Sequence, residues 1–180
     1  MANLWHDLPP GPGNVPEVIY VVIEIPKRSR NKFEYNKAGF IELDRVLYSS
    51  LHYPGDYGFI PRTYYDDGDP LDVLVMTDEP TFPGCVIEAR PLGIFRMLDG
   101  ELHDDKILAV PATDPLFNEY KNLADIPPHF LQEVSHFFAV YKDLQHIRVE
   151  ALNWEGREVA LEEIERSLSL YAKYLRTSRQ

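Results

Sequence analysis

Hydrophobic residues in the first two thirds of the chain fall into short runs separated by turn signals. The run "VIYVVIEI", residues 18–25, is rich in β-branched residues and stops at Pro26, which is typical of a β-strand. Further short strands are predicted between turn sequences such as "YPGDYG", "DDGDP" and "LDG", at residues 32–36, 40–45, 57–61, 71–76, 85–97 and 106–111. Short strands at this frequency favour a closed or nearly closed β-barrel.

The last third of the chain has the spacing of helices. The segment "HFLQEVSHFFAVYKDL", residues 129–144, follows two prolines suited to a first helical turn, with Asp125 placed to cap it. A second helix is predicted over 158–176, with Glu162 and Arg166 paired on its surface. Its apolar stripe, at alternating spacings of three and four, consists of Leu161, Ile164, Leu168, Tyr171 and Leu175.

These elements predict an α+β protein that is mainly β, a barrel with packed helices. Residues 1–16, in which "LPPGPGNVP" holds four prolines and two glycines, are expected to form an irregular arm that leads into the first strand. At 180 residues the chain is long enough to bury a real core. We therefore expect residues 1–180 to form a single domain.

Charge and cysteine content narrow the compartment and the partners. A formal net charge of −11 disfavours general binding to nucleic-acid phosphates, which depends on Lys and Arg. The single Cys85 cannot form an internal disulfide, which fits a reducing cytoplasm. The start lacks the features of a secretory signal, and the longest stretch without Asp, Glu, Lys or Arg, residues 46–55, is far shorter than the roughly 20 residues of a membrane span. We expect a cytoplasmic protein that binds neither nucleic acid nor membrane.

The strongest candidate site lies in "DDGDPLDVLV", residues 66–75. Four aspartates occupy seven positions here, and no Lys or Arg occurs between residues 63 and 89 to offset their repulsion. The glycine and the proline turn the backbone so that Asp67, Asp69 and Asp72 could converge on one point, and Mg²⁺ prefers carboxylate oxygens of this kind. The spacing does not fit a calcium loop of helix-loop-helix type, which needs Gly at its sixth position. A solvated acidic turn is the alternative interpretation.

A second acidic stretch, "LDGELHDDK", supplies Asp99, Asp104 and Asp105, followed by Lys106, in a turn between two apolar strands. Two carboxylate turns at one end of a barrel could hold the pair of metal ions that clamps attacking and leaving oxygens in phosphoryl chemistry. Taken alone, the stretch is equally typical of an ordinary surface hairpin.

Basic and aromatic residues complete the candidate chemistry. Lys32 in "NKFEY", Arg45 in "ELDRV", and Tyr141 and Lys142 in "AVYKDL" are each typical of a solvated strand or helix face. Together they supply the donors that phosphate oxygens need where no metal takes them.

Five blocks of the sequence resemble one enzyme family. The blocks "YVVIEIP", "KFEY", "YPGDYGFIPRT", "DGDPLDVLV" and "HFFAVYKDL" occur in the order seen in the soluble, single-domain, Mg-dependent inorganic pyrophosphatases of family I, from about residue 16 to residue 144. The resemblance implies a five-stranded β-barrel of OB type with flanking α-helices. It also implies hydrolysis of pyrophosphate to two phosphates by a metal-activated water, with several Mg²⁺ ions per site and no covalent intermediate.

The resemblance also assigns roles by motif. Asp69 matches the general base, and Glu34 and Tyr53 match supporting positions. The residues that match metal ligands are Glu24, Asp67, Asp72, Asp99 and Asp104. The residues that match phosphate-binding groups are Lys32, Arg45, Tyr57, Lys106, Tyr141 and Lys142. A lone aspartate, with a pKa near ~4, is too weak a base for free water, so Asp69 can serve only if cations acidify that water.

The resemblance also implies self-assembly, because family members of this size commonly form hexamers. His136 fits the usual interface pattern, whereas Val140 stands where a second histidine often occurs. We therefore expect a homohexamer.

Two other classes of function remain open at this point. The OB-type barrel also serves oligonucleotide binders, which a fluorescence-polarisation titration with single-stranded DNA would reveal. A protein that only binds cations would take up Mg²⁺ without releasing phosphate.

Overall fold

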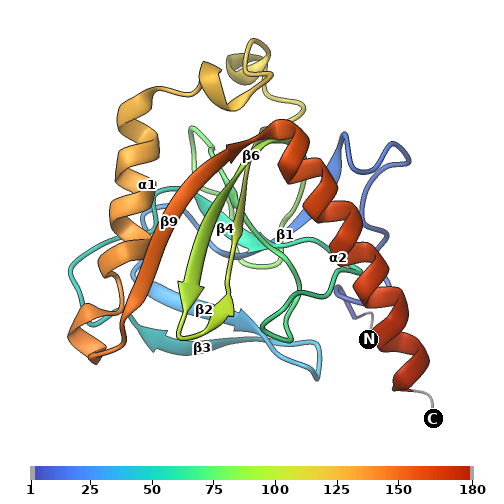
Figure 1. Ribbon diagram of the computed structural model, residues 1–180, viewed down its shortest axis with the longest axis horizontal. Coiled ribbons are helices and arrows are strands. Elements are labelled where there is room, and N and C mark those ends of the chain that lie inside the picture. Colours follow the sequence, from blue (N-terminus) through green and yellow to red (C-terminus); the bar gives the residue numbers. More distant parts are fainter. Residues whose placement is uncertain (1–2, 179–180) are drawn as a thin grey trace.

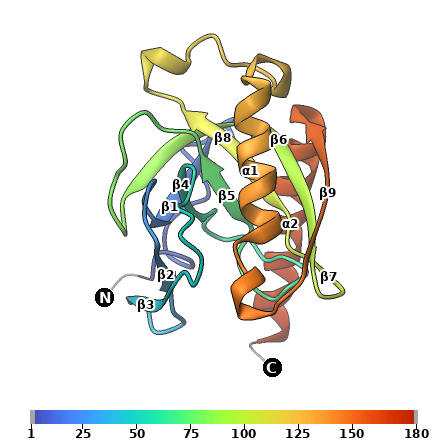
Figure 2. The ribbon, with the colours of Figure 1, turned by 90° about the vertical axis from the view of Figure 1, so that its left-hand side faces the viewer.

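The computed structural model describes residues 3–178, and five strands form a closed ring at its centre (Figure 1 and Figure 2). In ring order the strands are β1 (Ile19–Ile25), β4 (Asp56–Phe59), β5 (Asp72–Val75), β8 (Lys106–Pro111) and β6 (Val86–Asp99). β6 also pairs with β1, which closes the ring. All pairs are antiparallel except β5 with β8. The predicted five-stranded barrel of OB type is confirmed.

Four further strands extend or flank the ring. β7 (Leu102–His103) and β9 (Val149–Gly156) pair with β6, while β2 (Asn31–Tyr35) and β3 (Ile41–Val46) form a separate hairpin. β6 reaches all its partners because it is 14 residues long and shifts register between Pro91 and Gly93. The sequence pattern did not predict β9, because most of its residues are exposed and its apolar residues do not alternate.

Two helices lie on different sides of the ring (Figure 1). α1 (Pro128–Val140) ends four residues earlier than predicted, and Asp143–Gln145 form a separate 3-10 turn. Asp125 does not cap α1: its carboxylate accepts hydrogen bonds from the backbone N–H groups of Lys121 and Asn122, at 2.9 and 2.8 Å. Asp125 therefore stabilises the 3-10 turn Leu123–Asp125, which precedes α1. A further 3-10 turn lies at Pro115–Phe117.

α2 (Arg157–Thr177) is the longer helix, and its surface pairing differs from the prediction. Arg166 contacts Glu163 and Asp66 rather than Glu162, so the helix is bound to a distant turn instead of only to itself. Within residues 3–178, neither helix combines the length and the apolar character that crossing a membrane requires.

Strand alternation divides the core between the two helices. On β8, Ile107 belongs to a buried cluster that includes Ile164 of α2, whereas the next residue, Leu108, belongs to a cluster that includes Phe138 of α1. Successive side chains of a strand point to opposite faces, so one strand contributes to both clusters. Because each fully buried Leu, Ile or Phe stabilises the fold by roughly 1.5–3 kcal/mol, both helices are held firmly on the ring.

Residues 3–16 form an arm without helix or strand, and Trp5 anchors it. The indole is buried, donates a hydrogen bond from Nε1 to the Thr63 carbonyl at 2.9 Å, and stacks on Tyr174 of α2 with ring centroids 5.9 Å apart. Arg62 adds a hydrogen bond from its backbone N–H to the Trp5 carbonyl. The arm therefore connects the segment after β4 to the far part of α2.

Ring closure requires a glycine at position 58, because β1 and β4 approach closely there. A Cβ atom on Gly58 would lie 1.8 Å from the carbonyl oxygen of Val22. We expect Gly58→Ala to lower the free energy of unfolding by about 3 kcal/mol or more, since the strands would have to separate. Gly156→Ala is the control, because its Cβ would meet no atom within 4 Å, and we expect a loss below about 1 kcal/mol. Urea unfolding of both variants measures the difference, and equal losses would contradict the close approach.

Candidate active site

A pocket of about 450 Å³ lies beside the ends at which β5 and β8 begin. Its walls come from these two strands, from β1, from the β2–β3 hairpin and from the segment that follows α1. The pocket is lined by every residue for which the sequence predicted a role: Glu24, Lys32, Glu34, Arg45, Tyr53, Tyr57, Asp67, Asp69, Asp72, Asp99, Asp104, Lys106, Tyr141 and Lys142. The structure thus brings the predicted set together, while the role of each member stays a prediction.

The strand topology explains why the two acidic turns meet. β5 and β8 are parallel neighbours, so Asp72 and Lys106, the first residues of the two strands, lie directly beside each other. Asp104 precedes β8, and Asp99 ends β6, which runs antiparallel to β8. Carboxylates from both turns therefore reach the same end of the ring.

Lys106 is the cation at the centre of this acidic wall. Its ammonium donates hydrogen bonds to Asp72, at 2.6 Å, and to Asp104, and only 3% of its side chain is exposed. Burial alone would lower the pKa of Lys106, but Asp104 and Asp72 raise it well above its usual value. Tyr57 adds a phenol that donates to Asp72 at 2.6 Å. One buried charge thus offsets two carboxylates.

Three carboxylates of the pocket, those of Glu24, Asp67 and Asp69, are poorly compensated. Burial raises the pKa of Glu24 to about 8, against which a 2.7 Å hydrogen bond from the Tyr35 backbone N–H acts only in part. Burial and the charge of Asp72 raise the pKa of Asp67 to about 7, and the same two causes raise the pKa of Asp69. Seven carboxylate side chains and five Lys or Arg side chains line the pocket among the described residues, so its formal charge is negative, as the sequence predicted for this acidic run.

The donor chemistry of the wall suits hard divalent cations, because all five predicted ligands are carboxylates in a partly buried pocket. Nevertheless, within residues 3–178, no three carboxylate, histidine or cysteine side chains already stand close enough to hold a metal ion. The expected convergence of the "DGDPLD" carboxylates on one point is thus not seen in this arrangement. Asp72 and Asp104 instead share the ammonium of Lys106.

The pocket also presents basic and phenolic groups. Lys32 and Arg45, which are paired across the β2–β3 hairpin, both contact the Asp44 carboxylate, at 2.9 and 3.3 Å. The Nε of Arg45 is buried and has no hydrogen-bond partner among the described residues. Lys142 donates to Asp99 at 2.5 Å, and its ammonium lies 5.4 Å from the centre of the Tyr141 ring. These donors line the same pocket as the carboxylates.

Several pocket residues were not predicted from the sequence, namely Trp5, Tyr35, Asn36, Lys37 and Leu102. Lys37 continues the basic run of "NKFEYNK", which was a usable signal. Trp5 had none, because its position depends on contacts with residues about 60 and 170 positions away. Asp44 was also missed, and it aligns two predicted phosphate-binding residues without lining the pocket itself.

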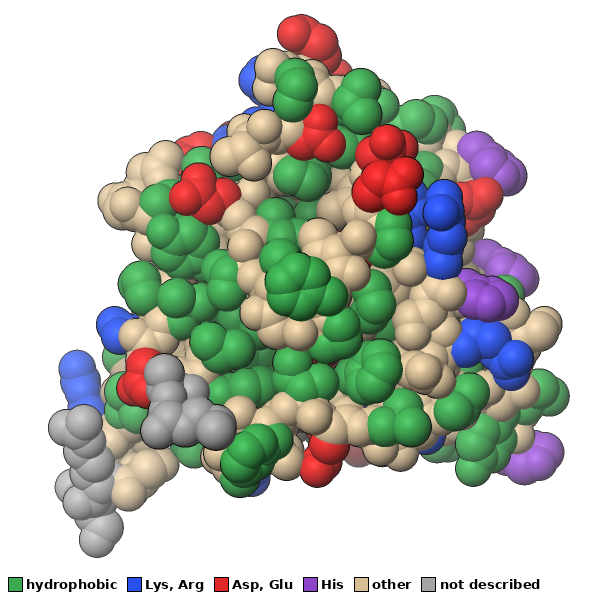
Figure 3. Space-filling view, turned by 180° about the vertical axis from the view of Figure 1, so that it is seen from behind, with side chains coloured by type: hydrophobic (Ala, Val, Ile, Leu, Met, Phe, Trp, Pro, Cys, Tyr) green, Lys and Arg blue, Asp and Glu red, His purple; other side chains and the backbone are tan. Residues whose placement is uncertain are grey.

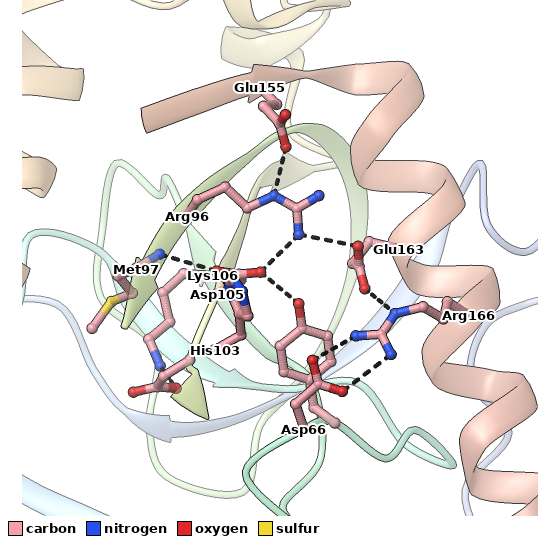
Figure 4. Close-up of polar contacts among 11 residues, drawn as sticks. Asp66, Arg96, Met97, His103, Asp105, Lys106, Glu155, Glu163 and Arg166 are labelled. Carbon is pink, nitrogen blue, oxygen red and sulfur yellow. Dashed lines mark hydrogen bonds and ion pairs between the residues drawn. The ribbon is translucent and has the colours of Figure 1, made fainter. Parts of the chain in front are cut away.

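Two aspartates of the acidic runs do not reach the pocket. Asp66 is bound by the guanidinium of Arg166, and Asp105 is fully buried against Arg96 (Figure 4). Asp66 and Asp105 are thus bound outside the pocket, whereas their chain neighbours Asp67 and Asp104 line it.

A pocket lined by carboxylates and by ammonium, guanidinium and phenol groups suits a small, highly charged oxyanion held together with cations. An enzyme that acts on phosphate compounds is the class of protein that such a pocket fits.

Comparison with known proteins is more specific. Residues 21–172 match the family model described as inorganic pyrophosphatase. The inorganic pyrophosphatase of Haloferax volcanii is 51% identical over 173 residues, which cover 95% of this chain and 97% of the relative. Soluble inorganic pyrophosphatase 1 of Arabidopsis thaliana is 45% identical, over 97% of this chain and 82% of the relative.

The solved structures agree with the sequence relatives. The crystal structure of inorganic pyrophosphatase from Thermus thermophilus matches with a TM-score of 0.91 at 43% identity, over 95% of this chain and 99% of that chain. The chain belongs to the inorganic pyrophosphatase family. It is an enzyme of the diphosphatase class, a hydrolase that splits pyrophosphate.

The excess negative charge of the pocket predicts that a divalent cation stabilises the fold. A ligand that binds only the folded state at 100 times its dissociation constant adds about 2.7 kcal/mol to the free energy of unfolding. We expect Mg²⁺ to raise the melting temperature in differential scanning calorimetry, at an ionic strength held constant with NaCl. The rise should shrink when Asp67 and Asp72 are both replaced by Asn. A melting temperature that does not change over a wide Mg²⁺ range would contradict this account.

Proposed function

We propose that the pocket hydrolyses pyrophosphate to two phosphates with several Mg²⁺ ions and without a covalent enzyme intermediate. The observation that carries this proposal is that one pocket gathers carboxylates that lack compensating cations together with several donors for phosphate. The carboxylates that would hold Mg²⁺ are Glu24, Asp67, Asp72, Asp99 and Asp104. Bound there, Mg²⁺ would lower the pKa of water and neutralise phosphate oxygens.

Asp69 is the proposed general base. It follows Gly68 in the turn before β5, where its backbone N–H donates to the Asp67 carboxylate at 3.1 Å. Within residues 3–178, no ion pair and no hydrogen bond to its own carboxylate ties it down, in contrast to Asp72 and Asp104. Its side chain is therefore free to accept a proton from the attacking water.

The basic and phenolic residues of the pocket are proposed to hold the two phosphoryl groups. Lys32, Arg45 and Lys142 are among them, and the unpartnered Nε of Arg45 offers a donor that a phosphate oxygen would satisfy. Lys106, which also binds Asp72 and Asp104, and the phenols of Tyr57 and Tyr141 complete the set. These groups would offset the charge that grows on the leaving phosphate.

Two further residues are proposed to hold these phosphate-binding side chains in position. Glu34 lies 3.6 Å from the ammonium of Lys32, and the ring of Tyr53 packs 5.3 Å from the ring of Tyr57. Burial raises the pKa of Tyr53 well above its usual value, so this phenol is neutral. The two residues would restrict where Lys32 and Tyr57 can point.

The absence of a covalent intermediate is supported by the pocket composition. The described residues that line the pocket include no Ser, Thr, Cys or His, so the side chains that could attack phosphorus are carboxylates, lysines and phenols, to which the proposal gives other roles. Water is then the simplest nucleophile.

Phosphate release from pyrophosphate tests the reaction and the base together. We expect fast release that requires Mg²⁺, stops with EDTA, and falls by roughly 10²–10⁴ in kcat for Asp69→Asn, which keeps the shape but loses the base. Asp78→Asn is the matched control, since Asp78 belongs to the same acidic segment but lies outside this pocket. Release that persists in Asp69→Asn would reject Asp69 as the base. Mg²⁺ binding by well-folded protein without any phosphate release would favour a protein that only binds cations.

We also propose that the chain forms a cytoplasmic homohexamer. Large apolar side chains such as Phe82, Tyr48 and Leu116 are exposed, and Figure 3 shows a broad face on which hydrophobic side chains gather. Faces of this kind are typical of protein–protein contacts. Cys85 is a free thiol, in keeping with a reducing compartment.

Sedimentation equilibrium tests the assembly. We expect a mass six times that of the chain, which persists on dilution to micromolar concentration. A mass equal to one chain over the whole concentration range would reject self-assembly, and a different multiple would correct the number of subunits.

A further inference from the structure

The two acidic turns share a pattern that the catalytic proposal does not use. In the first turn, Asp67 lines the pocket and the preceding Asp66 is bound by Arg166. In the second turn, Asp104 lines the pocket and the following Asp105 is bound by Arg96. We propose that Arg96 and Arg166, joined by Glu163, form a positioning bridge that holds both metal-binding turns in register. This inference rests on the proposed function, because it assigns the bridge a role in metal binding.

The first half of the bridge holds the turn that carries Asp67. Arg166 of α2 binds both carboxylate oxygens of Asp66, at 2.8 and 3.1 Å, and its guanidinium lies 5.1 Å from the centre of the Tyr65 ring. One residue further along the helix, the carbonyl of Ser167 accepts a hydrogen bond from the backbone N–H of Tyr64 at 3.1 Å. α2 thus holds three consecutive residues of the chain just before Asp67.

Backbone hydrogen bonds within the turn of residues 65–69 connect Asp66 to the residues that line the pocket. The Tyr65 backbone N–H donates to the Asp69 carbonyl at 2.8 Å, and the Gly68 N–H donates to the Tyr65 carbonyl at 3.0 Å. Gly68 has a φ of +91°, a conformation that keeps the turn tight and that glycine adopts without strain. Because the turn is closed on itself, a fixed Asp66 also fixes the direction of Asp67.

The second half of the bridge holds the turn that carries Asp104. The buried carboxylate of Asp105 accepts hydrogen bonds from Arg96 at 2.7 Å, from the Tyr65 hydroxyl at 2.6 Å and from the Met97 N–H at 3.0 Å. The Met97 carbonyl in turn accepts a hydrogen bond from the Asp104 N–H at 3.0 Å. The backbone on both sides of the Asp104 side chain is therefore fixed.

The two halves are continuous through Glu163, as Figure 4 shows. One of its carboxylate oxygens accepts a hydrogen bond from Arg96 at 3.0 Å, and the other accepts one from Arg166. Glu155 of β9 binds the Nε of Arg96 at 2.5 Å and limits where that guanidinium can move. The Tyr65 hydroxyl provides a second connection, because its residue belongs to the first turn and its partner Asp105 to the second. Groups that orient ligands in this way govern metal affinity.

Charge and positioning predict opposite results when Arg166 is removed. Loss of a positive charge makes the field at the pocket more negative, so by charge alone Mg²⁺ would bind more tightly. Loss of a positioning group lets the first turn move, so Mg²⁺ would bind more weakly. The direction of the change therefore separates the two effects.

The first test is isothermal titration calorimetry of Mg²⁺ into Arg166→Gln and into wild type, which does not depend on activity. We expect affinity about tenfold weaker in the variant, with partial recovery in Arg166→Lys, which keeps the charge but not the bidentate contact. Arg157→Gln is the matched control, because Arg157 also joins α2 to a distant carboxylate, that of Glu17, but touches neither turn. Unchanged or tighter binding in Arg166→Gln would overturn the inference, as would an equal loss in Arg157→Gln.

The second test removes the connection between the turns without changing any charge. Tyr65→Phe keeps the buried ring and loses only the hydroxyl that Asp105 accepts from. We expect weaker Mg²⁺ binding and a higher Mg²⁺ concentration for half-maximal activity, while kcat at saturating Mg²⁺ changes by less than about threefold because the reacting groups remain. A role in stability alone would lower the melting temperature and leave Mg²⁺ affinity as in wild type. If wild type itself bound no Mg²⁺, the proposed function would fail first, and the bridge with it.

Discussion

Repulsion between carboxylates held at one end of the strand ring is the constraint on which the rest of this structure depends. The parallel register of β5 and β8 brings Asp72 and Asp104 to the same point, with Lys106 between them. Two like charges 4 Å apart at an effective dielectric constant of 20 repel by about 4 kcal/mol, a large share of the roughly 5–15 kcal/mol that stabilises a typical domain. The site must therefore be supported from its surroundings, and it must still leave charge for cations to neutralise.

The support is divided between near and distant parts of the chain. Lys106 acts from inside the pocket, where its pKa is raised by the carboxylates that it binds. Arg96 and Arg166 act from behind the turns, where they satisfy Asp66 and Asp105 and leave Asp67 and Asp104 to face the pocket. The crowding of aspartates in the sequence thus has two purposes, since neighbouring residues serve the pocket and its attachment to the scaffold.

Local signals in the sequence predicted most of the strands and the two acidic turns, whereas the full set of pocket residues was predicted from the resemblance to a known family. Turn residues and alternating apolar runs determine the strands, and carboxylates next to glycine and proline mark the site. Alternation also contains a signal that was not used: Asp104 and Lys106 are two positions apart and share a face, so Asp105 between them must point elsewhere.

The features that could not be predicted from the sequence depend on residues far apart in the chain. Arg166 was assigned to Glu162 on its own helix, yet it binds Asp66, 100 residues earlier. β9 has no apolar alternation and exists because β6 offers it a paired edge.

The anchoring of Trp5 has a consequence for the order in which this enzyme becomes complete during synthesis. The indole lines the pocket, yet it stacks on Tyr174 and so depends on α2 being present. The acidic turn at residues 66–72 emerges from the ribosome long before Arg166, and β1 must wait for β6 to close the ring. Contacts so far apart in sequence form late in folding, because loop closure must precede them. A nascent chain therefore carries the acidic residues well before it carries a finished pocket, which needs β6 and α2 in place.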